Sequence, residues 1–207
     1  MMRLRSKSTQ LVVLVFAIGD SEFGVSNLQT HVDYWNLRSK DSVDFFFVGY
    51  RTPLGIDGEP SPTKDQPSEF LPHAFVNAIE TIEAASSWEF PGQASIIIGR
   101  AVIPTTEGYE SSQAVIDFSS IVEFDLVKAL KNEVIDSVPA LFEAIIRVVR
   151  DRHGTKPEWL LSDRLGGRKL WDSFVEGVAS KLPKGVQKMA AAMDCFRIKN
   201  LERPNFS

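Results

Sequence analysis

Two apolar segments separated by an amphipathic one restrict the possible folds more than any other feature of the chain. Residues 11–18 are continuously apolar and end at Gly19-Asp20, as in a strand buried on both faces of a sheet. Residues 43–48 (VDFFFV) form a second such run. Strand, helix and strand predict a βαβ unit with a right-handed crossover. The helix is indicated by apolar residues at spacings of 3, 4 and 3, namely Val25, Leu28, Val32 and Trp35.

Further elements follow the opening unit. The stretch 51–67 is rich in proline and glycine, which predicts a long functional or mobile loop. A helix is expected over 68–87. Residues 94–103 predict a third strand, kinked or bulged at Gly99-Arg100, and residues 113–118 a fourth. The short link between these two strands suits a hairpin.

The C-terminal third has a helical period from about residue 123, with a break at Pro139. Two more helices are expected over 169–182 and 185–196. We therefore predict a single α/β domain over 1–207, with a sheet-containing body (1–122) and a mainly helical, basic C-terminal part (123–207). The expected architecture is a four-stranded mixed sheet with helices on both faces, in a thioredoxin-like or Rossmann-like three-layer arrangement.

The N-terminus and the cysteine content bear on location. Arg3, Arg5 and Lys7 before the first apolar run imitate a secretory signal, but the richness of that run in valine and isoleucine favours a strand. The run is much shorter than the roughly 18 residues of a membrane span. Cys195, the only cysteine, excludes an intramolecular disulfide, and its apolar neighbours indicate a buried thiol. We expect a cytoplasmic protein without membrane contact.

Charge is distributed unevenly along the chain. Residues 1–146 carry 10 Lys and Arg against 20 Asp and Glu, a net charge of −10, and residues 147–207 carry 13 against 7, a net charge of +6. The basic C-terminal part either contacts another molecule or lies against the acidic body of its own chain. Nucleic-acid binding is the less favoured possibility, because no binding motif and no basic stripe interleaved with aromatics is present.

The string Gly19-Asp20-Ser21 resembles the first block of the GDSL (SGNH) hydrolase family, in which an apolar strand runs into Gly-Asp-Ser. The resemblance implies a small-molecule ester hydrolase with Ser21 as nucleophile and Asp20 beside it. The Gly-x-Asn-Asp block of the family has no counterpart here, and residues 151–153 (Asp-Arg-His) differ in spacing from its Asp-x-x-His block. A helix N-cap formed by Asp20 or Ser21 accounts for the same residues.

The sequence lacks the motifs of metal, nucleotide and redox sites. The three histidines are scattered, and the carboxylates Asp117, Glu123 and Asp125 read more simply as an acidic helix start than as ligands for metal-assisted chemistry. The glycine-rich loops of dinucleotide and triphosphate enzymes are absent, as is a Cys-x-x-Cys pair. We therefore predict neither a metal nor a cofactor.

The carboxyl ends of the strands are the expected place for a site in an open α/β sheet. They present Asp20 and Ser21 after the first strand and Tyr50 and Arg51 after the second; Arg100 joins them only if the third strand ends near its bulge. Because no catalytic set is complete, our leading interpretation is a non-enzymatic domain that acts through protein–protein contacts, as a homo-oligomer or in a multi-protein assembly. Tryptophans are either contact or core residues in this interpretation, namely Trp88, Trp159 and Trp171.

Overall fold

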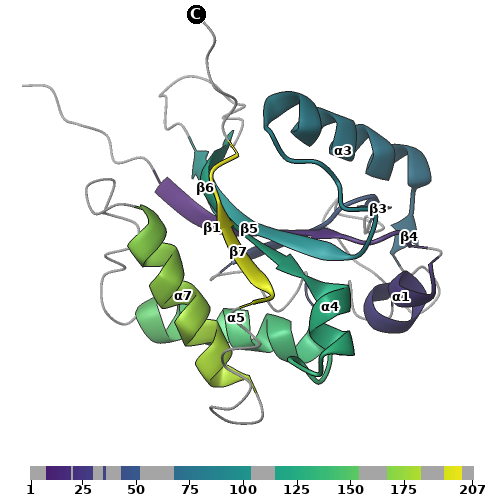
Figure 1. The fold of residues 1–207 in the computed structure, drawn as a ribbon. Helices are drawn as coiled ribbons and strands as arrows, with labels where there is room; N and C mark the ends of the chain where they lie inside the picture. Colours follow the sequence, from purple (N-terminus) through teal and green to yellow (C-terminus); the bar gives the residue numbers. More distant parts are fainter. Residues whose placement is uncertain are drawn as a thin grey trace, which may run out of the picture.

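A computed structural model of the chain describes residues 8–19, 21–29, 35, 43–51, 68–103, 115–153, 167–182 and 194–201. These residues form a five-stranded mixed sheet with helices against both faces (Figure 1). The predicted α/β class is confirmed, but the predicted number of four strands is wrong. The strand order is β2-β1-β5-β6-β7, with β1 at Ser8–Phe16, β2 at Asp44–Phe47, β5 at Ser95–Ile103, β6 at Val115–Asp125 and β7 at Phe196–Lys199.

The two strands of the predicted βαβ unit are confirmed. β1 pairs in parallel with β2, and Val13 lies opposite Phe45. The N-terminal apolar run is thus a central strand of the sheet. A short helical segment follows β1, made of α1 (Glu22–Gly24) and the π-helical η1 (Val25–Gln29). The right-handedness of the crossover stays a prediction.

β5 and β6 form the expected antiparallel pair, and their register shifts between Ile98 and Arg100. This confirms the irregularity predicted at Gly99-Arg100. Between the pairs formed by Ile98 and Arg100, β5 has one residue, Gly99, and β6 has residues 118–121, so the extra residues lie on β6. β6 continues to Asp125, so the helix expected from residue 123 begins later. The Asp125 carboxylate accepts a hydrogen bond from the backbone N–H of Lys128 at 2.8 Å, which caps α4 (Leu126–Lys131).

Helices cover the two faces unequally. α3 (Pro72–Ala85) lies on one face, while α4, α5 (Val138–His153) and α7 (Gly167–Lys181) lie on the other (Figure 1). The helix expected over 185–196 is wrong at its end, because residues 194 and 195 form a turn and Phe196 begins β7; residues 183–193 lie outside the described part. A four-residue strand is too short for its alternation to stand out from a helical period.

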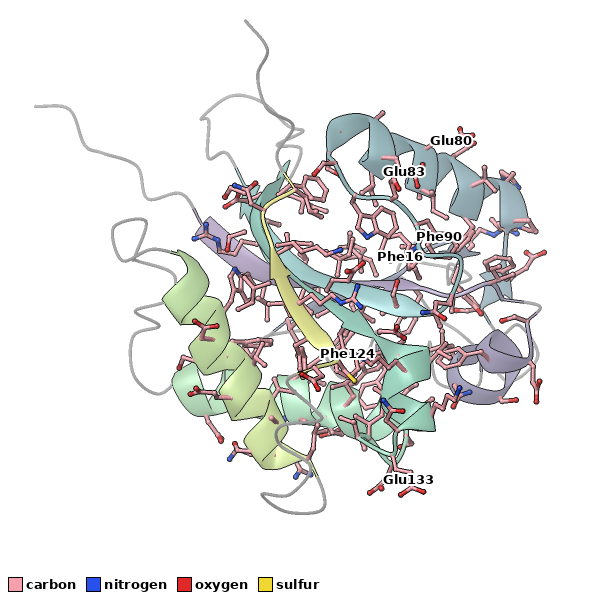
Figure 2. All side chains as sticks on the ribbon, in the orientation of Figure 1. Phe16, Glu80, Glu83, Phe90, Phe124 and Glu133 are labelled. Atoms are coloured by element: carbon pink, nitrogen blue, oxygen red, sulfur yellow. The ribbon has the colours of Figure 1, made fainter. Side chains whose placement is uncertain are left out.

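The core has two parts, one on each face of the sheet. The larger part holds Trp35, Phe45 and Phe142, and the rings of Phe45 and Phe142 lie 4.8 Å apart. The smaller part lies under α3, where the ring of Phe16 is 4.7 Å from that of Trp88. Figure 2 shows Phe16 and Phe90 on this side and Phe124 on the opposite side. Trp88 and Trp171 are core residues, and Trp159 lies outside the described residues.

Two segments lie outside the main layers. β3 (Tyr50–Arg51) pairs antiparallel with β4 (Glu69–Phe70), and residues 52–67 of the expected loop are not described. The expected division at residue 122 falls within β6, and β7 from the C-terminal part completes the sheet. No helix in the described ranges has both the length and the apolar character needed to cross a bilayer.

Candidate functional site

The carboxyl ends of β1 and β2 meet at one edge of the sheet, as parallel pairing requires. Glycines allow the chain to pass closely there. A side chain at Gly19 would collide with the ring of Phe70, and one at Gly24 would collide with the backbone carbonyl of Ile18. Gly19 therefore has a packing role, independent of any chemistry at the neighbouring Ser21.

Ser21 is held by two local hydrogen bonds. Its hydroxyl donates to the carbonyl oxygen of Ile18 at 2.5 Å and accepts from the backbone N–H of Gly24 at 3.0 Å. An acceptor three residues before a free backbone N–H is the geometry of a helix N-cap. The hydroxyl of Ser21 thus stabilises the turn that leads into α1. Asp20, its expected partner at the site, lies outside the described residues.

Replacing Ser21 by alanine is expected to lower the free energy of unfolding by about 0.5–2 kcal/mol, because the N–H of Gly24 loses its acceptor. Urea denaturation of the variant measures the change. Ser180→Ala is the matched control, since its exposed hydroxyl only donates to the carbonyl oxygen of Gly177. Equal effects of the two substitutions would contradict a capping role for Ser21.

Tyr50 and Arg51 lie at the same edge, on β3. The ring of Tyr50 is 5.3 Å from that of Phe70, the side chain that also packs on Gly19, so this aromatic contact links the Ser21 turn to β3. Arg51 forms an ion pair with Glu69 at 2.8 Å, and both side chains are well exposed. Such a pair contributes little stability because water screens it.

Arg100 does not lie at this edge. β5 continues through the bulge to Ile103, so the condition for its joining the strand ends is not met. Arg100 lies opposite Leu11, whereas Phe16, at the end of β1, lies opposite Ser95. At 3.3 Å per residue, the five intervening steps place Arg100 about 16 Å away along the strand.

The guanidinium of Arg100 instead forms an ion pair with the Asp117 carboxylate at 2.6 Å, and both side chains are largely buried. The other Asp117 oxygen accepts hydrogen bonds from the backbone N–H and the hydroxyl of Ser119. Burial alone would raise the pKa of Asp117. The hydrogen bonds from Ser119 and Arg100 and the charge of Arg100 outweigh it and hold the pKa below its usual value.

Asp117→Asn is expected to lower the free energy of unfolding at pH 7 by about 1–3 kcal/mol, because a charged hydrogen-bonded pair is lost. A lowered folded-state pKa stabilises the protein above the unfolded value of 3.8, and this stability is lost as the pH falls through the folded-state pKa. The difference between wild type and variant should therefore shrink below pH 3.8 in urea titrations. Asp151→Asn, in an exposed pair with Lys181, is the control. A pH-independent difference for Asp117→Asn would contradict this account.

Part of the positive charge of the C-terminal region is paired within the chain. Lys199 forms an ion pair with Glu123 at 2.6 Å, and Lys181 pairs with Asp151 at 2.8 Å. Arg147 lies 3.9 Å from Glu143 on α5. The Lys199–Glu123 pair joins residues 147–207 to the acidic residues 1–146, whereas Arg147 and Glu143 are one turn apart on the same helix. At least Lys199 of the basic region therefore lies against its own chain.

One exposed feature is only weakly marked in the sequence. The side chain of Phe46 in β2 is 53% exposed, although its neighbours Phe45 and Phe47 are buried. β2 is at the end of the strand order, and among the described strands only β1 pairs with it. In the segment VDFFFV only Asp44, two residues before Phe46 on the same face of β2, marks that face as partly exposed.

Comparison with protein-family models, with curated proteins and with solved structures found no match for this chain. The described residues contain no group of three or more His, Cys, Asp and Glu side chains placed to hold a metal ion.

Proposed function

We propose that the chain is a non-catalytic α/β module that acts through protein–protein contacts, with the side of β2 that no other described strand pairs with as its contact surface. One observation carries the proposal: a large aromatic side chain, Phe46, stands more than half exposed on an edge strand. Edge strands offer unpaired backbone groups to which another chain can add, and side chains beside the edge supply specificity.

The energetics favour contact at this position. Complete burial of an exposed phenylalanine is worth about 1.5–3 kcal/mol, so a partner that covers Phe46 gains binding energy from it. Soluble proteins commonly protect an edge with charges. β2 carries a single charged residue, Asp44 at its start, and burial raises the pKa of that carboxyl. The three phenylalanines after Asp44 add no further charge to this strand.

The partner is either a second copy of the chain or another protein. Two copies that pair through β2 would use the same surface on each subunit, as twofold symmetry requires. A hetero-partner would add its own strand or loop to the same edge. Both arrangements bury Phe46, so one substitution tests both.

Phe46→Lys is expected to abolish association through β2 while the protein stays folded, because a lysine ammonium cannot be buried without a partner. Light scattering after size-exclusion chromatography measures the mass of wild type and variant over a range of concentrations. Val76→Lys is the matched control, since Val76 is an exposed apolar residue on α3. Self-association that survives Phe46→Lys would place the contact elsewhere. A monomeric wild type would exclude the second copy as partner.

Ester hydrolysis with Ser21 as nucleophile is the alternative. The capping hydrogen bonds of the Ser21 hydroxyl favour the non-catalytic role, because its proton is held by the carbonyl oxygen of Ile18 and not by a general base, and the N–H of Gly24 occupies one of its lone pairs. Under our proposal a fluorophosphonate probe does not label the protein. Stoichiometric labelling that is lost in Ser21→Ala would establish the hydrolase.

Nucleic-acid binding by the basic C-terminal part is the second alternative. The ion pairs of Lys199 and Lys181 disfavour it, because paired cations contribute less to phosphate binding. Retention of a duplex or a single strand, with affinity that falls steeply with salt, would support it.

Two finer expectations also belong to the proposal. Of the two three-layer arrangements, we favour the thioredoxin-like one, because Rossmann-like sheets are mostly parallel and here only β1 and β2 pair in parallel. With a single cysteine, such a fold would serve as a scaffold without dithiol exchange. The cytoplasmic location rests on the same cysteine usage.

A further inference from the structure

A small pocket of about 110 Å³ lies where β5 begins, β6 ends and β7 begins. Its lining includes Gln93, Ser95, Glu123, Asp125, Cys195 and Arg197. Most of the residues that line this concave surface are thus polar or charged, and the strand-end residues Ser21, Tyr50 and Arg51 are not among them.

The sheet register explains why these side chains gather. Ser95 lies opposite Asp125, and Glu123 lies opposite Arg197. Their neighbours along the strands pack into the core under α4, α5 and α7. Because side chains alternate along a strand, the four polar residues face the side of the sheet that α3 covers.

The negative charges of the pocket are fixed in position. Glu123 is buried, and its carboxylate is held by Lys199 at 2.6 Å and by the indole N–H of Trp88 at 3.3 Å. Asp125 caps α4 with one oxygen and accepts from the side-chain amide of Gln93 at 2.9 Å with the other. Each carboxylate oxygen has a further lone pair for a ligand.

Two other side chains of the pocket have hydrogen-bonding groups that no described residue uses. Ser95 is 1% exposed, and its hydroxyl has no hydrogen-bond partner among the described residues. A buried hydroxyl without a partner is unfavourable and calls for an explanation such as a ligand. Arg197 is exposed, and no ion pair or hydrogen bond to another described residue holds its guanidinium. Its fork of N–H donors matches a carboxylate.

We propose that this pocket binds a small zwitterion of the amino-acid class. The ligand ammonium would lie by Asp125, its carboxylate would bind Arg197, and the Ser95 hydroxyl would hydrogen-bond to it. Lys199 balances Glu123 and Arg197 balances Asp125, so the charges favour a ligand that carries both signs. A pocket of about 110 Å³ suits a ligand of a few heavy atoms, such as glycine, alanine or serine, and is small beside the roughly 300–1,000 Å³ sites of larger ligands. This site is separate from the proposed protein contact at β2.

The test is isothermal titration calorimetry of the full chain with glycine and with L-serine. A ligand of so few atoms limits the expected dissociation constant to between roughly ten micromolar and several millimolar. Acetate and methylammonium each carry only one of the two charges. Each should therefore bind at least about tenfold more weakly than glycine.

Arg197→Gln and Ser95→Ala should each weaken binding about tenfold or more. Arg147→Gln removes an exposed positive charge from α5 and should leave binding unchanged. Absence of zwitterion binding up to about 50 mM, well above the range set by ligand size, would overturn the proposal. Acetate that binds as tightly as glycine would overturn it too, in favour of a simple anion site. Equal losses in Arg197→Gln and Arg147→Gln would show non-specific charge attraction.

Discussion

Replacing Phe45 by alanine is expected to lower the free energy of unfolding by about 3–5 kcal/mol, because truncation leaves a cavity in a packed core. Phe45 is 5% exposed, and its ring contacts those of Trp35 and Phe142 at centroid distances of 6.2 and 4.8 Å. These contacts fasten the edge strand β2 to Trp35 and to α5. Urea denaturation monitored by circular dichroism measures the loss.

Phe46→Ala is the matched control for this prediction, since it truncates the same side chain one position further along β2. Because about half of the Phe46 side chain is exposed to water, its truncation should lower the free energy of unfolding by less than about 1 kcal/mol. Similar losses for the two variants would contradict the assignment of β2 as an edge strand with one buried face. A large difference means that the fold does not depend on Phe46, which leaves the ring available to a partner.

Gly49→Ala is expected to destabilise the protein by about 2–5 kcal/mol through two separate effects. Gly49 has φ +82°, a region that L side chains rarely adopt, and a Cβ there would lie 2.6 Å from the Cβ of Phe75. Its carbonyl oxygen also accepts a hydrogen bond from the N–H of Leu71 at 2.7 Å, so the turn after β2 has little room to adjust. The loss is measured by thermal and urea unfolding.

Gly92→Ala separates the two effects. Gly92 has φ +74°, and a Cβ there would meet nothing within 4 Å, so the variant carries the backbone strain alone. We expect Gly92→Ala to lower the free energy of unfolding by about 1 kcal/mol. If both variants lost the same stability, the close packing of the turn after β2 against Phe75 of α3 would be contradicted.

Periodicity in the sequence was sufficient for most of the fold. The long apolar run before Gly19 identified β1, and Gly99 marked the place where the register of β5 and β6 shifts. β7 could not be found, because its four residues owe their strand conformation to pairing with β6, and Cys195-Phe196 continues the apolar period of a helix. Residues 123–125 resemble the start of a helix for a similar reason, since the apolar Phe124 fits both a helical and a strand period.

Site residues were harder to predict than elements. Ser21, Tyr50 and Arg51 follow two parallel strands, so the topology alone places them at one edge of the sheet. The position of Arg100 depends on where β5 ends, and pairing with β1 and β6 determines that end. The exposure of Phe46 had a single sign in the sequence, the polar Asp44 two residues earlier on the same face of β2. The set formed by Ser95, Glu123, Asp125 and Arg197 comes from three separate strands, and only their register brings it together.

Site-specific photo-crosslinking tests the central claim, contact through β2, most directly. A benzophenone side chain placed at Phe46 keeps an aromatic group on the edge strand and reacts with whatever covers it. We expect a discrete covalent adduct with one protein, identified by mass spectrometry as a second copy or another chain. The same group at Glu80, exposed on α3 (Figure 2), should give none. Equal crosslinking from both positions, or none from position 46 in cells that express the protein, would contradict the claim.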